Sequence, residues 1–388
     1  MLLKVVGIIH IVFYVINGAT SQGWAIDDDG CRTPDLGVGT CILAKDCGSM
    51  VSFLKMAPSP LPSHLKEKLR EYVCGYSGRK VKICCSDEPV SLMLSSRKVT
   101  DQPVKADSVE NHKNIGLLPE ECGYIGIPDK ISYGENAGLG EYPWMALLSY
   151  KTESGPSFQC GGTVINDKYI LTAAHCITEL QTPIIGVRVG DYDTSTKVDC
   201  EKQDDGTTKC VDEPVQDLFI EKIIPHPNFT KEYENENGFN DIGLLRVKGM
   251  KLADNVQPIC LPTGVARNAE LGSVIITGWG FTEKQPNTQS TILKKVIVPV
   301  ISQKKCQKSY QTIRVSEKQI CANGKQKDSC NGDSGGPLQT AKFLNDESRM
   351  VQYGVISFGG AICGAGTHPG LYTRVESYMK WILDNIEP

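Results

Sequence analysis

The stretch DSCNGDSGGPL (residues 328–338) places Ser334 among two aspartates, three glycines, a cysteine and a second serine, Ser329. A serine hydroxyl is a weak nucleophile until a base removes its proton, and the base needs an acidic group to orient it. Glycine-rich backbone can approach a reacting group closely. The stretch therefore indicates a nucleophilic serine, whose partners cannot be taken to be the neighbouring aspartates merely because they are close.

The histidine that best fits the role of the base is His175. The chain after its amino-terminal apolar segment has five histidines: His64, His112, His175, His226 and His368. The last two stand beside prolines in turn-like sequences, whereas His175 ends the apolar stretch LTAAHC (171–176). A lone histidine of this kind is more often a hydrogen-bonded structural residue. Asp241, however, begins another apolar stretch in NDIGLLRV (240–247), so His, Asp and Ser follow one another along the chain.

The amino terminus predicts export. Lys4 precedes the apolar stretch VVGIIHIVFYVI (5–16) and the small residues NGATS (17–21), which indicates a signal peptide over residues 1–21. The apolar stretch is shorter than the roughly 20 residues that span a bilayer, although a signal anchor is the alternative. We expect a secreted, extracellular protein that does not associate with a membrane. The balance of 41 basic and 45 acidic residues, 41 − 45 = −4, argues against a nucleic-acid partner.

All 16 cysteines follow the predicted signal peptide, and an even number in an exported chain indicates disulfides. Zinc is the alternative, but the spacing provides no pair of C-x-x-C motifs and Cys84 and Cys85 are adjacent. Six cysteines lie in residues 31–85, a segment too small to bury much core, where each cross-link would contribute about 2–4 kcal/mol. Residues 86–121 lack cysteine, aromatic residues and periodicity, and predict an exposed linker; the linker and activation segment together extend over 86–130.

The remainder of the chain predicts an all-β fold, because short β-branched stretches alternate with turn sequences. These stretches are TVINDKYILTAA (163–174), IIGVRVGDY (184–192), SVIITGWG (273–280), KKVIVPVI (294–301) and YGVISFGG (353–360). By pattern alone they fit a barrel or a sandwich. One helix is predicted over 375–386, where Val375, Met379, Ile382 and Ile386 share one face.

The motifs LTAAHC, DIGLL and GDSGGP, with TGWG between the last two, resemble those of the chymotrypsin/trypsin-like serine proteases over residues 131–388. The resemblance implies a chymotrypsin-like double β-barrel with a carboxyl-terminal helix. It also implies that His175 is the general base, Asp241 its orienting acid and Ser334 the nucleophile. The N–H groups of Gly332 and Ser334 match the oxyanion hole of the family. Inactive homologues lack the serine, whereas this chain has it.

The same resemblance gives the two neighbouring aspartates separate roles. Asp328 matches the residue at the base of the primary specificity pocket, where a buried carboxylate favours Lys or Arg, and Gly359 and Gly370 match the pocket walls. The alternative for Asp328 is an ordinary surface aspartate. Asp333 matches the residue that binds the new amino group after zymogen cleavage. That group would belong to Ile131, after a cut behind Lys130 by a trypsin-like activator, although ISYG departs from the usual Ile-Val-Gly-Gly start.

The six-cysteine segment resembles the clip domain of arthropod proteases, including its terminal Cys-Cys pair. Six cysteines alone leave about 15 connectivities open. The resemblance implies Cys31–Cys84, Cys41–Cys74 and Cys47–Cys85 in this segment. For the protease it implies Cys160–Cys176, Cys306–Cys321, Cys330–Cys363, Cys200–Cys210 in an extra loop, and Cys122–Cys260 between the linker and the protease.

Two further motifs suggest a ligand and a modification. Asp191, Asp193 and Asp199, with the carbonyl of Thr196, offer oxygen ligands for a structural Ca²⁺, as in related clip proteases; a solvated acidic loop is the alternative. Asn228 begins the glycosylation motif Asn-Phe-Thr.

These features together predict the secreted zymogen of a clip-domain serine endopeptidase that cleaves after Arg or Lys. The resemblance implies an extracellular cascade in melanisation, Toll signalling or development, with a venom role also compatible. Its substrate would be a protein such as prophenoloxidase or a Toll-ligand precursor, its activator a trypsin-like protease and its inhibitor a serpin. A digestive trypsin and a non-enzymatic clip-domain cofactor are the alternatives.

Overall fold

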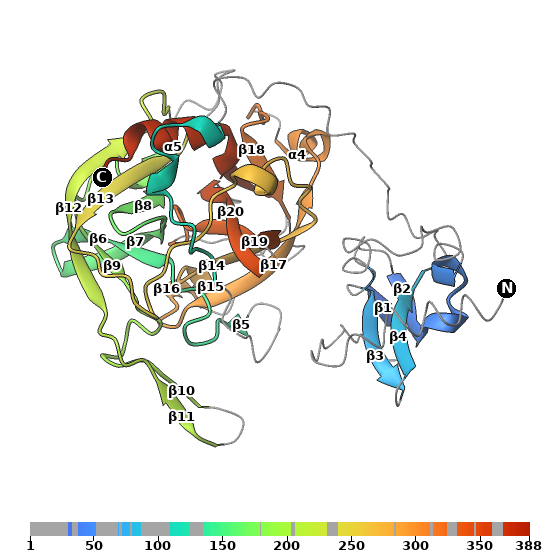
Figure 1. Ribbon diagram of the computed structural model, residues 1–388. Helices are drawn as coiled ribbons and strands as arrows, with labels where there is room; N and C mark the ends of the chain where they lie inside the picture. Colours follow the sequence, from blue (N-terminus) through green and yellow to red (C-terminus); the bar gives the residue numbers. More distant parts are fainter. Residues whose placement is uncertain are drawn as a thin grey trace. The chain divides into compact units, whose positions relative to one another are not determined.

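The computed structural model describes the chain in sections. These are residues 30–32, 38–51, 69, 72–77, 80–86, 109–124, 135–178, 180–202, 206–230, 240–282, 285–310, 313–323, 332–344, 347–358 and 368–388. The chain divides into two compact units, Met1–Pro103 and Val104–Pro388 (Figure 1).

The first unit is a small antiparallel sheet with strand order β1-β2-β4-β3. Its elements are β1 (Gly30–Arg32), β2 (Val38–Leu43), η1 (Ala44–Asp46), β3 (Val73–Ser77) and β4 (Lys80–Cys85). The three expected disulfides, Cys31–Cys84, Cys41–Cys74 and Cys47–Cys85, join these strands and the residues after η1. Met50, Leu69 and Ile83 are fully buried. The cross-links therefore stabilise a unit whose described core is small.

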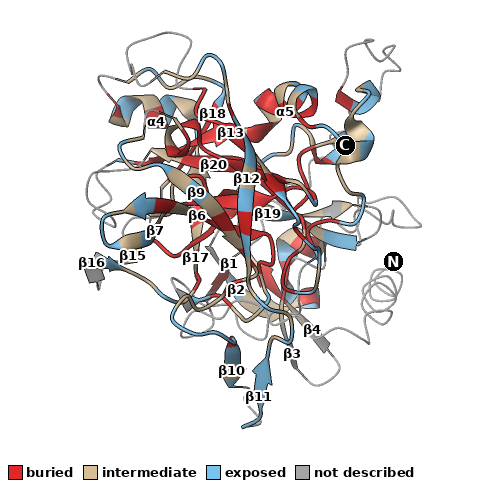
Figure 2. Ribbon diagram, turned by 90° about the vertical axis from the view of Figure 1, so that its left-hand side faces the viewer, coloured by how far each residue is buried: buried red, intermediate tan, exposed pale blue. Residues whose placement is uncertain are grey.

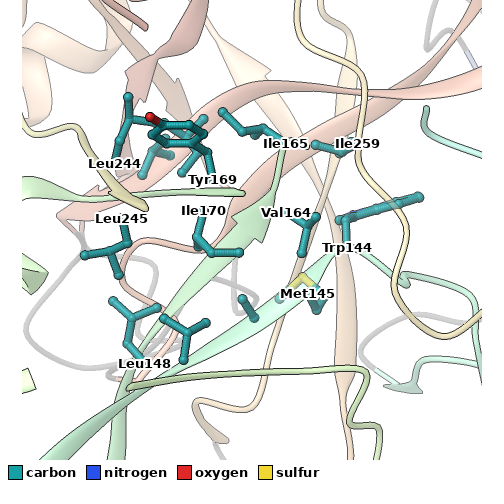
Figure 3. Packing of buried hydrophobic residues seen from close by; sticks show 14 of the residues in the cluster. Trp144, Met145, Leu148, Val164, Ile165, Tyr169, Ile170, Leu244, Leu245 and Ile259 are labelled. Atoms are coloured by element: carbon teal, nitrogen blue, oxygen red, sulfur yellow. The ribbon is translucent and has the colours of Figure 1, made fainter. Parts of the chain in front are cut away.

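The second unit contains a closed barrel of strand order β12-β13-β8-β7-β6-β9. Its strands are β6 (Met145–Thr152), β7 (Gly155–Val164), β8 (Tyr169–Thr172), β9 (Ile184–Val189), β12 (Gln216–Pro225) and β13 (Gly243–Lys248). Inward side chains such as Leu148, Ile170 and Leu245 are inaccessible to solvent and pack together (Figure 3). Closure leaves this barrel without an unpaired edge.

A second sheet of order β14-β19-β20-β21-β18-β17-β5 also closes, because β14 pairs with β17. Its strands are β5 (Glu135–Asn136), β14 (Ser273–Gly278), β17 (Lys294–Ile301), β18 (Gln319–Ala322), β19 (Pro337–Leu344), β20 (Glu347–Phe358) and β21 (Gly370–Arg374). The expected double β-barrel is confirmed. The expected terminal helix is η6 (Val375–Tyr378) followed by α5 (Met379–Asn385), and the four residues of its predicted face are fully buried.

Short elements complete the second unit. These are η2 (Val109–Asn111), η3 (Ile115–Leu117), η4 (Ala174–Cys176), the hairpins β10 (Cys200–Lys202) with β11 (Thr208–Cys210) and β15 (Phe281–Thr282) with β16 (Gln285–Gln289), η5 (Gly264–Ala266) and α4 (Gln303–Ser309). Strands β10 and β11 are mostly exposed, in contrast to the mostly buried barrel strand β13 (Figure 2). The disulfides Cys122–Cys260, Cys160–Cys176, Cys200–Cys210 and Cys306–Cys321 are present as expected; Cys330 and Cys363 lie outside the described residues.

Residues 109–124 differ from the exposed linker that the sequence predicted for 86–121, because they pack on the second unit. Val109 is buried, and Asn114 Nδ2 donates to the carbonyl oxygens of Leu383 (2.8 Å) and Ile386 (3.0 Å) at the end of α5. These acceptors include carbonyls that a helix end otherwise leaves unsatisfied. The contacts use single residues and backbone groups, so they leave no periodic pattern in the sequence.

Among the described residues, no helix combines the length and apolar character that crossing a bilayer requires.

Asn114→Ala should lower the free energy of unfolding of the full chain by about 1–2 kcal/mol, because two hydrogen bonds to the end of α5 are lost. Calorimetry should show a decrease of roughly 2–6 °C in the melting temperature of the second unit. The neighbouring Lys113→Ala is the control, because Lys113 is exposed and should change stability by less than about 0.5 kcal/mol. Equal effects of the two substitutions would show that Asn114 does not anchor this segment.

Candidate active site

His175 and Asp241 meet because the strands that carry them are neighbours. His175 lies in η4 directly after β8, and Asp241 lies two residues before β13, with Thr172 opposite Gly243 in the β8–β13 register. His175 Nδ1 is 2.7 Å from Asp241 Oδ2, and the His175 backbone N–H donates to Asp241 Oδ1 at 2.9 Å. The imidazole is thus held in one orientation with Nδ1 toward the carboxylate, which leaves Nε2 as the nitrogen that can accept a proton.

Asn240 fixes the turn that presents Asp241. Its φ of +37° is uncommon for a residue other than glycine but is tolerated by asparagine. The Asn240 side chain donates to Asn228 O (2.9 Å) and accepts from the hydroxyl of Tyr378 (2.9 Å). Asn240, directly before Asp241, is therefore anchored both to the loop after β12 and to η6.

The second barrel also holds Asp241. The Ser357 hydroxyl on β20 donates to Asp241 Oδ2 at 2.6 Å, and the Thr373 hydroxyl on β21 donates to Asp241 O at 2.7 Å. Asp241 is only 3% exposed, and its carboxylate accepts from His175 and Ser357. A buried carboxylate is stable only with such donors. Sequence reasoning missed Ser357, although its hydroxyl in the otherwise apolar YGVISF was a usable signal.

Ser334 lies at the junction of the two barrels. The N–H of Gly161 on β7 donates to Ser334 O at 2.7 Å, while the N–H of the next residue, Gly335, donates to Ile356 O on β20 at 2.8 Å. Gly332 has a φ of +97°, which favours glycine. The GDSGG turn is therefore fixed to both barrels, at the same junction where Ser357 reaches Asp241.

Asp333 occupies a notch made by the TGWG sequence. Its Oδ1 accepts from the N–H of Gly280 at 2.7 Å. A Cβ at Gly280 would lie 2.5 Å from Asp333 Cγ, so any side chain there would displace the carboxylate. The two motifs TGWG and GDSGGP thus depend on each other physically.

Several predicted site residues cannot be placed. Asp328, Gly359, Lys130 and Ile131 lie outside the described residues, whereas Gly370 is buried at the start of β21. Among the described residues, Cys160, His175 and Cys176 form one grouping with metal-ligand atoms, but the two cysteines are joined in a disulfide. Their sulfurs are thus not thiolate ligands for a metal.

The acidic loop after β9 brings some of the expected ligands together. Asp199 Oδ2 accepts from the N–H of Tyr192 (2.8 Å), and its Oδ1 accepts from the Thr196 hydroxyl (2.6 Å). Asp193 Oδ1 accepts from the Ser195 hydroxyl at 2.6 Å. Burial and, second, the charge of Asp199 raise the pKa of Asp191 to about 6. Asp191 Oδ1 is buried and has no hydrogen-bond partner among the described residues.

A cleft of about 610 Å³ extends from Gly332, two residues before Ser334. Its lining consists of Leu147, Ser157, Phe158, Gln159, Thr194, Trp279, Phe281, Thr288, Gln289, Ser290, Thr291 and Gly332. None of these lining residues is ionisable. The cleft thus offers apolar surface with amide and hydroxyl groups beside the serine turn.

Comparison with known families assigns both units. Residues 131–382 match the Trypsin family, and residues 31–85 match the regulatory CLIP domain of proteinases. Melanization protease 1 of Drosophila melanogaster is 34% identical over 398 residues, which cover 97% of this chain and 98% of the relative. Phenoloxidase-activating factor 1 of Holotrichia diomphalia is 35% identical over 388 residues, with 97% of each chain covered.

A solved structure agrees with these relatives. The crystal structure of the Drosophila Grass clip serine protease of the Toll pathway is similar, with a TM-score of 0.61 and 32% identity. The match covers 92% of this chain and 96% of Grass. The Trypsin match extends over more than half of the chain, and the fold and the His175–Asp241 pair agree with it. The chain belongs to the trypsin family of serine endopeptidases, in the group that carries an amino-terminal CLIP domain.

Proposed function

We propose that this protein is the secreted zymogen of a trypsin-like endopeptidase that cleaves after Arg or Lys in an extracellular proteolytic cascade. The observation that carries the proposal is the pair of His175 and the buried Asp241, which two hydrogen bonds join at the barrel junction that also holds Ser334. Its CLIP domain favours a regulatory protease over a digestive trypsin.

In the proposed mechanism Ser334 Oγ attacks the scissile carbonyl and His175 Nε2 takes the hydroxyl proton. Asp241 stays ionised and stabilises the imidazolium through Nδ1–H. The N–H groups of Gly332 and Ser334 bind the oxyanion of the tetrahedral intermediate. His175 then donates its proton to the leaving amine, which breaks the C–N bond. A water molecule, deprotonated by His175, hydrolyses the acyl-enzyme and restores Ser334.

Asp328 is proposed to select the residue before the scissile bond. A carboxylate at the base of a desolvated pocket binds a cationic side chain strongly, whereas an apolar side chain leaves the charge unpaired. Small residues at Gly359 and Gly370 would keep that pocket open.

The activated full chain should cleave chromogenic substrates with Arg or Lys before the scissile bond, and Phe substrates far more slowly. Ser334→Ala should lower kcat by about 10⁵–10⁶-fold, since serine and histidine act as a unit. Asp241→Asn should lower kcat by about 10⁴-fold, because the imidazole loses its correct tautomer. Initial rates on both substrate classes measure these effects.

Asp328→Ser is the matched control for specificity, because it should remove the preference for Arg while Ser334 still reacts with a fluorophosphonate probe. Faster cleavage after Phe than after Arg by the native sequence would refute the proposed pocket. Retained peptidase activity in Ser334→Ala would refute the proposed nucleophile.

Activation is proposed to follow cleavage between Lys130 and Ile131, after which the Ile131 amino group pairs with Asp333. The position of the Asp333 carboxylate beside Gly280, next to the serine turn, supports this role. The charge-assisted pair would order the turn that supplies the oxyanion hole.

Amino-terminal sequencing of the active enzyme should give Ile131 as the first residue of the protease fragment. Lys130→Gln should resist activation by a trypsin-like protease, and Asp333→Asn should be cleaved normally yet remain poorly active because its carboxylate is lost. Electrophoresis separates the two effects. The fragments should part only under reducing conditions, because Cys122–Cys260 joins them. Another amino terminus, or full activity of Asp333→Asn, would contradict the assignment.

The acidic loop is proposed to hold a structural Ca²⁺ through Asp191, Asp193, the Thr196 carbonyl and Asp199. All four are oxygen donors, as calcium prefers. The buried Asp191 Oδ1 without a partner among the described residues supports the fit, and the adjacent Asp199 adds a second negative charge. A bound cation would compensate for the burial of these carboxylates.

Calcium at 100 times its dissociation constant should stabilise the full chain by about 2.7 kcal/mol, seen as a higher melting temperature. Asp191→Asn should abolish this shift, whereas Asp212→Asn, at a nearby exposed carboxylate, should retain it. A melting temperature insensitive to calcium would instead favour a solvated acidic loop.

The remaining proposals concern the cellular setting. Residues 1–21 are proposed as a signal peptide. The exposed Asn228 is proposed as a glycan acceptor, which a mobility shift after glycosidase treatment would test.

The names of the relatives favour a role in melanisation or the Toll pathway. The proposed partners are prophenoloxidase or a Toll-ligand precursor as substrate, a trypsin-like activator and a serpin. Incubation of the activated enzyme with each candidate zymogen tests the substrate.

A further inference from the structure

Phe158 forms a wall of the cleft that begins at Gly332, whose described lining has no ionisable side chain. It lies on β7, two residues before Cys160, and is half-buried against the first barrel. Phe281 and Leu147 add apolar surface, while Gln159 and Gln289 add amide groups. A charged side chain bound here would lose hydration without gaining an ion-pair partner among the described lining residues. An apolar side chain would instead gain contact area.

Arg188 contacts the face of the Phe158 ring. The Arg188 guanidinium carbon lies 5.1 Å from the ring centroid, within the range of a cation–π contact. A guanidinium in contact with the face of the ring restricts where the ring can move. The position of the cleft wall therefore depends on how firmly Arg188 is itself fixed.

Two carboxylates fix Arg188. Its Nε and Nη2 donate to the two carboxylate oxygens of Asp217 at 2.7 and 2.9 Å, and its Nη1 donates to Asp191 Oδ2 at 3.3 Å. Asp217 lies opposite Arg188 in the register of β12 and β9, so the paired geometry is built into the barrel. Paired donation by a guanidinium to a carboxylate is the most directional of ion pairs.

The cleft and the proposed specificity pocket are formed by different elements. Gly370, a residue of the proposed specificity pocket, lies at the start of β21, and no described residue of β20 or β21 lines the cleft. The cleft is lined instead by the β7 residues just before Cys160, whose disulfide partner Cys176 follows His175. A substrate with its basic side chain in the pocket would therefore place the residues after the scissile bond in the cleft.

We propose that Arg188 is a positioning residue that fixes Phe158 as a wall of this cleft, and that the cleft thereby selects an apolar residue just after the scissile bond. The inference rests on the proposed function and adds to it a substrate class. The preferred protein substrate carries Arg or Lys, followed within two residues by an apolar side chain and not by an acidic one.

Internally quenched peptides test this selection with the activated full chain. The peptides share Arg before the scissile bond and carry Leu, Gly or Asp at the first or the second position after it. At one of these positions the native sequence should give a kcat/KM ratio of Leu to Gly of about tenfold, with Asp below Gly. Phe158→Ala and Arg188→Gln should each reduce that ratio to about threefold or less, because the wall is lost or freed.

Arg246→Gln is the matched control. Arg246 also stacks on an aromatic ring, Tyr169, at 5.6 Å and pairs with Glu221 at 3.2 Å, but neither it nor Tyr169 lines the cleft. Its Leu-to-Gly ratio should equal that of the native sequence. If Arg188→Gln fails to fold, Asp217→Asn replaces it, since the 68%-exposed Asp217 side chain can be changed with little risk to the core. Asp217→Asn should also lower the ratio.

A short substrate that ends at Arg distinguishes failure of the proposed function from failure of the inference about the cleft. If it is not cleaved, the proposed function is wrong and this inference falls with it. If it is cleaved but the native ratio stays within about twofold, or survives in Phe158→Ala, the cleft does not select and the inference alone is overturned. A ratio lowered by Phe158→Ala but unchanged in both Arg188→Gln and Asp217→Asn would refute the positioning role.

Discussion

The buried carboxylate of Asp241 is the constraint on which the rest of this structure depends. At 3% exposure it would be costly without donors, and those donors come from both barrels: His175 from the first and Ser357 from the second. The carboxylate therefore has all three of these hydrogen bonds only when the two barrels are docked. Catalytic geometry and the packing between the barrels are then a single property, because any separation that loosened Ser357 would also expose a buried charge.

The serine turn follows the same logic. Ser334 O accepts from Gly161 of the first barrel, while Gly335 donates to Ile356 of the second. Asp333, between the turn and Gly280, leaves no space for a side chain at that glycine. Ser334 is thus placed by backbone hydrogen bonds and close approach, which explains why this turn is so rich in glycine. Neither aspartate of the turn is needed as the acid, since Asp241 already has that geometry.

Much of the fold and of the candidate active site could be predicted from the sequence. The strands were predictable because β-branched stretches with turns between them leave a local pattern, and the helix because Val375, Met379 and Ile382 repeat with its period. His175, Asp241 and Ser334 were predictable because they lie in the motifs LTAAHC, DIGLL and GDSGGP. Ser357 and the packing of Asn114 on α5 were not predicted, because a contact between residues more than a hundred positions apart leaves no local pattern. The stack of Arg188 on Phe158 likewise depends on barrel register, which places Asp217 opposite Arg188.

Asp191 connects the acidic loop with the cleft through its Oδ2 and Arg188. Oδ2 accepts from Arg188 at 3.3 Å, whereas the buried Oδ1 has no partner among the described residues. A calcium ion at Oδ1 and the guanidinium at Oδ2 would share one carboxylate, so the negative charge that burial makes costly would be compensated from both sides. The guanidinium in turn supports the Phe158 ring. A loop that is remote from Ser334 in sequence is thus in physical contact, through one arginine, with a surface that the substrate would touch.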